Sequence, residues 1–206
     1  MAEKSDKQLD ARPWALAITR ALSFAEEQNA RIVGVTGERA GSGVSMMSRE
    51  LVHAYVRHGM SAVLIDASRL NLTEAAPEQD HAAQVKLLDI AKWAETNIYE
   101  VDLAHHAAQL PTSSEEMARW LKAELVGHQT IIVDLPAIRP DAANQVQALR
   151  VVGSACDIVY LVCLSGITTS SELNQAVESC KIHRVPIGGL IVNDWKHPWT
   201  SLAAGL

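Results

Sequence analysis

A glycine-rich turn between an apolar stretch and a helical stretch constrains the fold of this chain most. Residues Arg31–Thr36 are apolar and rich in β-branched side chains, and Ser45–His58 carries apolar residues at helical spacing before Gly59. The turn between them reads Gly-Glu-Arg-Ala-Gly-Ser-Gly-Val. Backbone N–H groups of such a turn, together with the positive end of the following helix, can surround a phosphate group. The pattern therefore predicts a phosphate-binding loop behind a buried strand.

One position of this loop departs from the usual pattern. Val44 stands where a phosphate-binding loop carries its lysine, whereas Ser45 keeps the hydroxyl that meets Mg²⁺. Because a lysine–phosphate contact contributes roughly 1.5–3 kcal/mol, its loss predicts ATP binding weakened by about ten- to a hundredfold. Arg39 is interpreted either as a second phosphate contact or, preferably, as a solvated loop charge. The candidate nucleotide-binding residues are Gly37, Arg39, Gly41, Ser42, Gly43, Val44, Ser45 and Met46.

Two aspartates follow apolar stretches elsewhere in the chain. Asp66 ends Ala62–Asp66, and Asp134 lies near the end of Thr130–Leu135. Parallel sheets place their ligand crevice at the carboxyl ends of the strands, so the two carboxylates are expected to meet beside the loop. Either aspartate alone would read as an ordinary turn residue. Together with Ser45 they are the candidate Mg²⁺ ligands if nucleotide binds, and the catalytic candidates if the protein is active.

Alternation of strand-like and helix-like segments indicates the fold class. We expect an α/β fold with a mainly parallel sheet and helices on both faces. The chain, residues 1–206, is predicted to form a single domain, with 1–12 as a flexible N-terminal tail. The expected strands are Arg31–Thr36, Ala62–Asp66, Asn97–Leu103, Thr130–Leu135, Asp157–Leu164 and Ile187–Asn193.

Composition excludes several classes of partner. The net charge is −6 and no basic cluster stands out, which argues against a nucleic-acid partner. No run of 18 apolar residues predicts insertion into a membrane, and the polar N-terminus favours a cytoplasmic location. The three cysteines lack metal-ligand spacing and are expected to be reduced, packed thiols.

The order and spacing of these motifs resemble the cytoplasmic kinase domain of bacterial tyrosine autokinases (BY-kinases) of capsule and exopolysaccharide export. This family belongs to the MinD/ParA-like branch of P-loop NTPases. "TGERAGSGVS" stands at the family's phosphate loop, "VLIDASRL" at its second acidic motif and "IIVDLPAI" at its third. The segment from Ala155 to Asp194 resembles the last two strands and the helix between them.

Departures from the family pattern shape the expected function. Val44 replaces the loop lysine, Ser68 replaces the second acid of the Asp-Ala-Asp motif, and no tyrosine follows Tyr160 where such kinases carry a tyrosine-rich tail. In the first helix the family's Glu-x-x-Arg-x-x-Arg assembly motif retains only Arg20, so self-association into a homo-oligomer is left open.

The resemblance favours a pseudo-kinase that is not an active enzyme. It would act as a docking or regulatory partner of the cytoplasmic segment of a membrane polysaccharide co-polymerase, which could recruit it to the inner membrane. No cofactor is expected to bind tightly, although ATP or ADP with Mg²⁺ could bind weakly. The alternatives are a nucleotide-binding switch with slow or no turnover and an active MinD/ParA-like ATPase, or a tyrosine kinase if catalysis survives.

Overall fold

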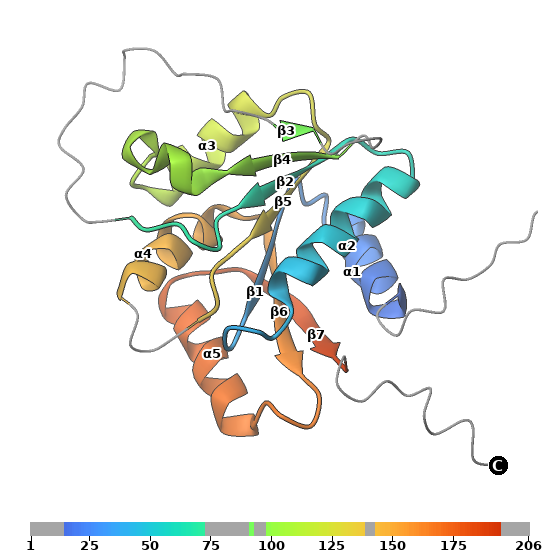
Figure 1. The fold of residues 1–206 in the computed structure, drawn as a ribbon, viewed down its shortest axis with the longest axis vertical. Helices are drawn as coiled ribbons and strands as arrows, with labels where there is room; N and C mark the ends of the chain where they lie inside the picture. The colour runs from blue at the N-terminus through green and yellow to red at the C-terminus, as the bar shows by residue number, and fades with distance from the viewer. Residues whose placement is uncertain (1–14, 73–90, 93–97, 139–142, 195–206) are drawn as a thin grey trace, which may run out of the picture.

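The computed structural model describes residues 15–72, 91–92, 98–138 and 143–194. Its centre is a seven-stranded sheet in the order β3-β4-β2-β5-β1-β6-β7 (Figure 1). All strands are parallel except β3, which pairs antiparallel with β4 at one edge. The strands are β1 (Ile32–Gly37), β2 (Ala62–Asp66), β3 (Ala91–Lys92), β4 (Tyr99–Asp102), β5 (Thr130–Asp134), β6 (Ile158–Leu164) and β7 (Ile187–Asn193). The expected mainly parallel sheet is confirmed.

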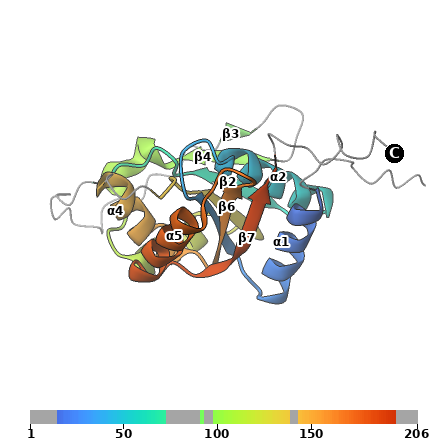
Figure 2. The same cartoon turned by 90° about the horizontal axis from the view of Figure 1, so that it is seen from below.

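Helices cover both faces of the sheet, as expected. Side chains of α1 (Ala15–Glu27) and α2 (Val44–Arg57) pack into one apolar cluster, on the first face. Side chains of three further helices pack into a second cluster, on the other face (Figures 1 and 2). These helices are α3 (Ser114–Glu124), α4 (Ala143–Val151) and α5 (Ser170–Ile182), accompanied by the short 3₁₀ turns η1 (Leu103–Gln109) and η2 (Gly153–Ala155).

Local signals in the sequence set the helix ends. Gly59 adopts the left-handed conformation, with φ of 79°, directly after α2. The Ser113 side chain accepts a hydrogen bond from the Glu116 amide at the start of α3. Thr169 and Glu172 form a reciprocal capping box at the start of α5. The predicted helix over Ser45–His58 is thus found one residue earlier, at Val44–Arg57.

Strand register brings three carboxylates to one edge of the sheet. Asp66 on β2 pairs in register with Asp134 on β5 and, on its other side, with Asp102 on β4. β1 ends beside them at Gly37, where the glycine-rich turn begins. The carboxyl ends of the parallel strands are therefore the edge at which the loop and the acidic residues meet.

Differences from the expected elements are small. The strand expected from Asn97 begins at Tyr99 and stops at Asp102, whose side chain accepts a hydrogen bond from the Ala104 amide and starts η1. β3 was not expected, because two residues carry no periodicity. The expected flexible tail at 1–12 lies outside the described residues.

Two further expectations concern cysteines and membranes. Cys156, Cys163 and Cys180 are free and buried, which confirms packed thiols. Within the described part of the chain, no helix combines the length and apolar character needed to span a membrane.

Candidate functional site

The turn between β1 and α2 retains the backbone geometry of an anion cradle. Gly41 and Gly43 adopt left-handed conformations with φ of 82° and 95°, which residues with a side chain rarely adopt. No side chain caps α2. Among the described residues, the amides of Val44, Ser45 and Met46 donate to no acceptor. The positive end of α2 therefore faces the loop with its donors free.

The interior of the loop is filled by two of its own side chains. A Cβ atom placed on Gly37 would overlap the Ser42 hydroxyl and would lie 2.8 Å from Cγ2 of Val44. Both side chains therefore lie close over Gly37. Ser42 is fully buried, and Val44 is partly buried against the apolar cluster beneath α1 and α2. A methyl group thus lies inside the loop, and none of the residues that the structure describes places a lysine there.

Hydrogen bonds hold this loop in its folded form. The Ser42 hydroxyl donates to the carbonyl oxygen of Arg39, at 2.9 Å. The Asn193 side-chain amide, at the end of β7, donates to the carbonyl oxygen of Ser42, at 2.8 Å. Because Asn193 also lies against Gly43, it supports the loop from outside. These hydrogen bonds stabilise the loop internally and connect it to the end of β7 in the sheet.

Arg39 is paired with carboxylates at the surface of the loop. Its Nη2 lies 3.1 and 3.2 Å from the two carboxylate oxygens of Glu172, and its Nε lies 3.3 Å from Oε1 of Glu38. The Arg39 side chain is 39% exposed, so it is a partly solvated charge that also has carboxylate partners, which the sequence did not indicate. A phosphate contact by Arg39 stays a prediction, and it would require breaking this ion pair.

Glu38 places a negative charge at the start of the loop. Its side chain is only 2% exposed. Oε1 accepts a hydrogen bond from the Thr168 hydroxyl at 2.6 Å, whereas Oε2 has no partner among the described residues. A buried carboxylate beside a phosphate cradle repels phosphate oxygens, since charges interact strongly where water is excluded.

The predicted acidic residues do meet beside the loop. Burial raises the pKa of Asp134 to about 6, the Ser45 side chain opposes this rise by hydrogen bonding, and the charge of Asp66 adds to it. Asp134 is 4% exposed, and its Oδ1 has no partner among the described residues. Ser45, Asp66 and Asp134, predicted as a group from separate segments, are thus neighbours.

Asp66 is engaged by its own turn. Its Oδ1 accepts hydrogen bonds from the backbone amide of Ser68 at 2.9 Å and from the Ser68 hydroxyl at 2.6 Å. Ser68 stands where the family has its second acid. Its amide and hydroxyl therefore hydrogen-bond to Asp66, the first acid of that motif. Among the described residues no three His, Cys, Asp or Glu side chains form a group that could hold a metal ion. A Mg²⁺ ion at this edge would need further oxygen ligands from a bound nucleotide.

Some residues of the site suit Mg²⁺–nucleotide and others do not. The free amides of α2 and the unpartnered Oδ1 of Asp134 suit phosphate and a hydrated cation. Val44, the diverted Arg39 and the buried Glu38 do not suit phosphate. The residues that the structure describes here therefore do not by themselves form a complete Mg²⁺–ATP site.

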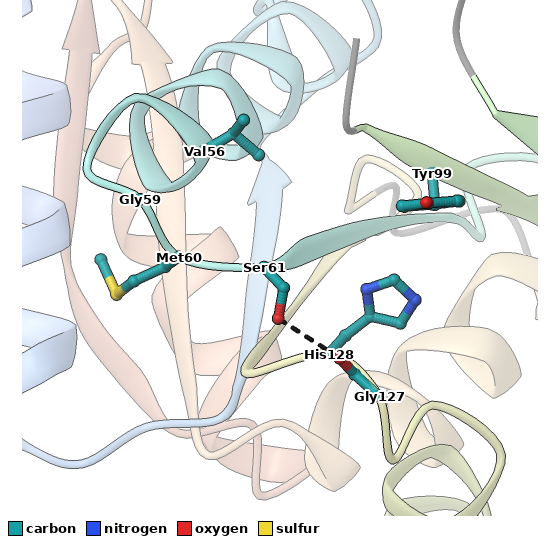
Figure 3. Close-up of a pocket in the computed structure, with 7 residues that line it drawn as sticks. All are labelled: Val56, Gly59, Met60, Ser61, Tyr99, Gly127 and His128. Atoms are coloured by element: carbon teal, nitrogen blue, oxygen red, sulfur yellow. Dashed lines mark hydrogen bonds between the residues drawn. The ribbon is translucent and has the colours of Figure 1, made fainter.

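A separate pocket of about 590 Å³ lies away from the loop (Figure 3). It lies at the amino ends of the strands, where Ser61 precedes β2 and Tyr99 begins β4. The rings of Tyr99 and His128 meet edge to face, with centroids 5.1 Å apart. Burial, and then the charge of Arg31, lowers the pKa of His128, so this ring is neutral at pH 7. None of the predicted site residues lines this pocket.

The fold and the position of the loop define the class of protein. They are those of a P-loop NTPase-like α/β domain, with the loop between the first strand and the following helix. No protein-family model and no curated protein matches the sequence.

Solved structures with this fold include bacterial tyrosine kinases. The BceF tyrosine kinase domain is 20% identical, with a TM-score of 0.64, over 88% of this chain and 75% of that one. The kinase domain of the Escherichia coli tyrosine kinase ETK is 19% identical, with a TM-score of 0.64, over 88% and 73%. The resemblance to the BY-kinase domain is confirmed at the level of the fold.

The MinD-like branch is represented as well. The septum site-determining protein MinD of Pyrococcus horikoshii, solved with Mg-ADP, is 20% identical, with a TM-score of 0.56, over 80% of this chain and 70% of that one. The fold is therefore shared by kinases and by ATPases.

Sequence reasoning missed the residues that surround the loop. Glu38 could have been noticed, because a carboxylate inside a phosphate loop is unusual. Glu172 could be expected as a helix cap from Thr-Ser-Ser-Glu, but not as the partner of Arg39, which lies 133 residues away. Thr168 and Asn193 carried no signal for contacts with Glu38 and Ser42.

Proposed function

We propose that this protein is a degenerate relative of the tyrosine autokinases, in which the loop has become a structural element. The observation that carries the proposal is Val44. Its side chain stands at the lysine position and lies over Gly37. A catalytic lysine neutralises charge on the transferred phosphoryl group, and such electrostatic stabilisation is often the largest contribution to the rate. With this lysine absent, kinase and ATPase turnover are lost.

The surroundings of Val44 support this proposal. Arg39, the nearest alternative cation in the loop, has Glu172 and Glu38 as partners. Moving Arg39 to a phosphate would leave the buried Glu38 carboxylate without its cation, and an unpaired buried charge is costly. The loop therefore opposes the rearrangement that would compensate for the valine.

The partner follows from the family resemblance. Tyrosine autokinases of this type act at the cytoplasmic segments of membrane polysaccharide co-polymerases. A protein that keeps this fold without its chemistry is suited to bind such a segment, and to regulate polymer export by that contact. It would act in the cytoplasm and be recruited to the inner membrane by the partner.

Genetic replacement tests this proposal. Polymer export would be measured in a strain that lacks the gene and carries either the wild-type protein or Asp134→Asn, which keeps the side chain's size but removes its charge. We expect export to fail without the protein and to be restored by both forms. Co-purification with the co-polymerase encoded in the same genome should succeed equally with both forms. The proposal would be overturned if Asp134→Asn did not restore export although it was folded, as abundant as the wild type and bound to the partner.

A nucleotide-binding switch is the second candidate. The free amides of Val44, Ser45 and Met46 favour it, because they can still bind phosphate oxygens. Under this alternative, ATP or ADP binds through the loop backbone, Ser45 and Asp66, next to Asp134, with slow or no turnover. Export would then depend on Asp134 in the replacement experiment, which separates the two candidates.

A further inference from the structure

A cationic pocket is lined by residues at the ends of three helices, α3, α4 and α5. These helices cover one face of the sheet (Figure 1). Its volume is about 410 Å³, which falls within the usual range for small-molecule sites of about 300–1,000 Å³. The N-terminus of α3 contributes one wall, the C-terminus of α4 with η2 a second, and the C-terminus of α5 a third. The lining residues are Thr112, Ser113, Ser114, Arg150, Val151, Ser154, His183 and Arg184.

This pocket is separate from the phosphate loop. Glu172, in the first turn of α5, contacts the loop through Arg39, whereas His183 and Arg184 follow the last turn of the same helix. A helix of 13 residues is about 20 Å long, at 1.5 Å per residue. A ligand in the pocket would therefore not touch the loop.

The charged side chains that line the pocket are two arginines. Arg150 and Arg184 line it, and none of the lining residues that the structure describes carries a carboxylate, although Glu116 is hydrogen-bonded to the lining residue Ser113. Neither guanidinium has a hydrogen-bond or ion-pair partner among the described residues. Arg39 and Arg69, by contrast, are paired with carboxylates at 3.1–3.2 Å. Two arginines without a carboxylate partner in the described part of the chain thus line one pocket of a protein whose net charge is −6.

Further donors come from the start of α3. Thr112 and Ser114 add hydroxyl groups, and the helix adds the positive end of its dipole. The Ser113 hydroxyl is already used, because it donates to Glu116. Guanidinium groups match phosphate oxygens with paired donors, and hydroxyls and a helix N-terminus bind the same oxygens.

The backbone at Arg184 gives this residue particular interest. Arg184 has a φ of 59°, and its amide and that of Val185 donate back to Lys181 and Cys180, which closes the end of α5. Glycine is the usual residue at such a helix end. Because the backbone conformation at Arg184 favours glycine, the helix end does not itself require the arginine side chain.

We propose that this pocket binds the phosphate group of a small phosphorylated molecule. The arginines also lie at helix C-termini, where a cation complements the dipole without any ligand. A purely structural role of this kind would affect stability alone. Phosphate binding would in addition cause saturable changes in amide chemical shifts that depend on the side chains of Arg150 and Arg184.

The test uses amide chemical shifts of the complete protein, titrated with inorganic phosphate and pyrophosphate at constant ionic strength. We expect saturable shifts at residues 112–114, 150–154 and 183–184. Arg184→Gly should weaken the response at least about tenfold, the loss of one charge-assisted contact, while leaving the protein folded, because glycine suits this backbone. Arg150→Gln should weaken it similarly.

Arg20→Gln is the matched control, since it removes one exposed positive charge from α1, on the opposite face of the sheet. It should leave the titration unchanged. The proposal is overturned if the shifts do not saturate, if Arg184→Gly binds like the wild type, or if only residues 43–46 respond. The last outcome would mean that phosphate binds at the loop alone. This conclusion about the pocket does not depend on whether the proposed function is correct.

Discussion

Among single residues, Val44 is the one to which the proposed function assigns weakened phosphate binding. The free amides of α2 already face the loop, so Val44→Lys would supply the missing charge without new backbone geometry. We expect ATP–Mg²⁺ affinity to rise by about ten- to a hundredfold, the value of one charge-assisted contact. Calorimetric titration measures this change, with Val44→Met as the uncharged control of similar reach. Equal affinities of the two variants would show that the folded loop excludes phosphate irrespective of charge.

Glu172 is expected to restrain Arg39. Glu172→Gln would weaken the ion pair, whereas glutamine can still cap α5. In a Val44→Lys background we expect a further few-fold gain in ATP affinity, because Arg39 loses one of its two carboxylate partners and its Nη2 can then contact phosphate. Glu116→Gln, at the equivalent capping position of α3, is the matched control and should give no gain. If both variants bind ATP equally, Arg39 does not contribute.

Asp134 should make stability depend on pH. Burial raises its folded pKa to about 6 from 3.8, so the folded state holds its proton more tightly than the unfolded state. Stability from this group is therefore greatest in acid and falls as pH rises through that interval. Asp134→Asn removes the effect. Relative to wild type, it should gain about 2 kcal/mol more at pH 8 than at pH 4.5, from about 1.4 kcal/mol per pKa unit. Urea unfolding at both pH values measures the free energy of unfolding of the two proteins. If Asp134→Asn differs from the wild type by the same amount at pH 4.5 and at pH 8, the raised pKa of Asp134 is refuted.

At the scale of elements, the folded loop depends on close contact with the end of β7. An alanine at Gly43 would be strained, with φ of 95°, and its Cβ would overlap the Asn193 side chain. An alanine at Gly41 would be strained but would meet nothing within 4 Å. We expect Gly41→Ala to cost about 1 kcal/mol and Gly43→Ala about 1–3 kcal/mol more, as for other overpacked sites. Urea unfolding of both variants gives the difference, and equal losses would contradict the loop contact.

Sequence predicted the elements well because their signals are local. The six parallel strands are short apolar stretches ended by turn residues, and Gly59 marks a helix end that the structure confirms. The meeting of Asp66 and Asp134 was also predictable, because the carboxyl ends of parallel strands share one edge.

Contacts between distant segments were not predictable in the same way. Asn193 and Ser42 are 151 residues apart, and the position of one relative to the other depends on the strand order and on the length of β7. The antiparallel β3, only two residues long, carries no periodicity from which it could be recognised. The partner of Arg39 was missed for the same reason, since the position of Glu172 depends on where α5 begins.

At the scale of the whole molecule, the account joins a retained fold to a lost chemistry. The sheet, the helices on both faces and the turn between β1 and α2 match solved tyrosine kinase domains in fold. Within that turn Val44 stands at the lysine position, the Glu38 side chain is buried and Arg39 is paired with carboxylates. Under the proposed function these residues weaken nucleotide binding, whereas a surface that binds a protein partner is kept.

Affinity for ATP–Mg²⁺, measured by isothermal titration calorimetry on the wild-type protein, tests this account most directly. With the lysine contact missing, we expect a dissociation constant weaker than about 100 μM, equivalent to a binding free energy smaller than about 5.5 kcal/mol. A dissociation constant in the low micromolar range would contradict the account, because the loop would then hold nucleotide without the lysine and the protein would be a nucleotide-binding switch.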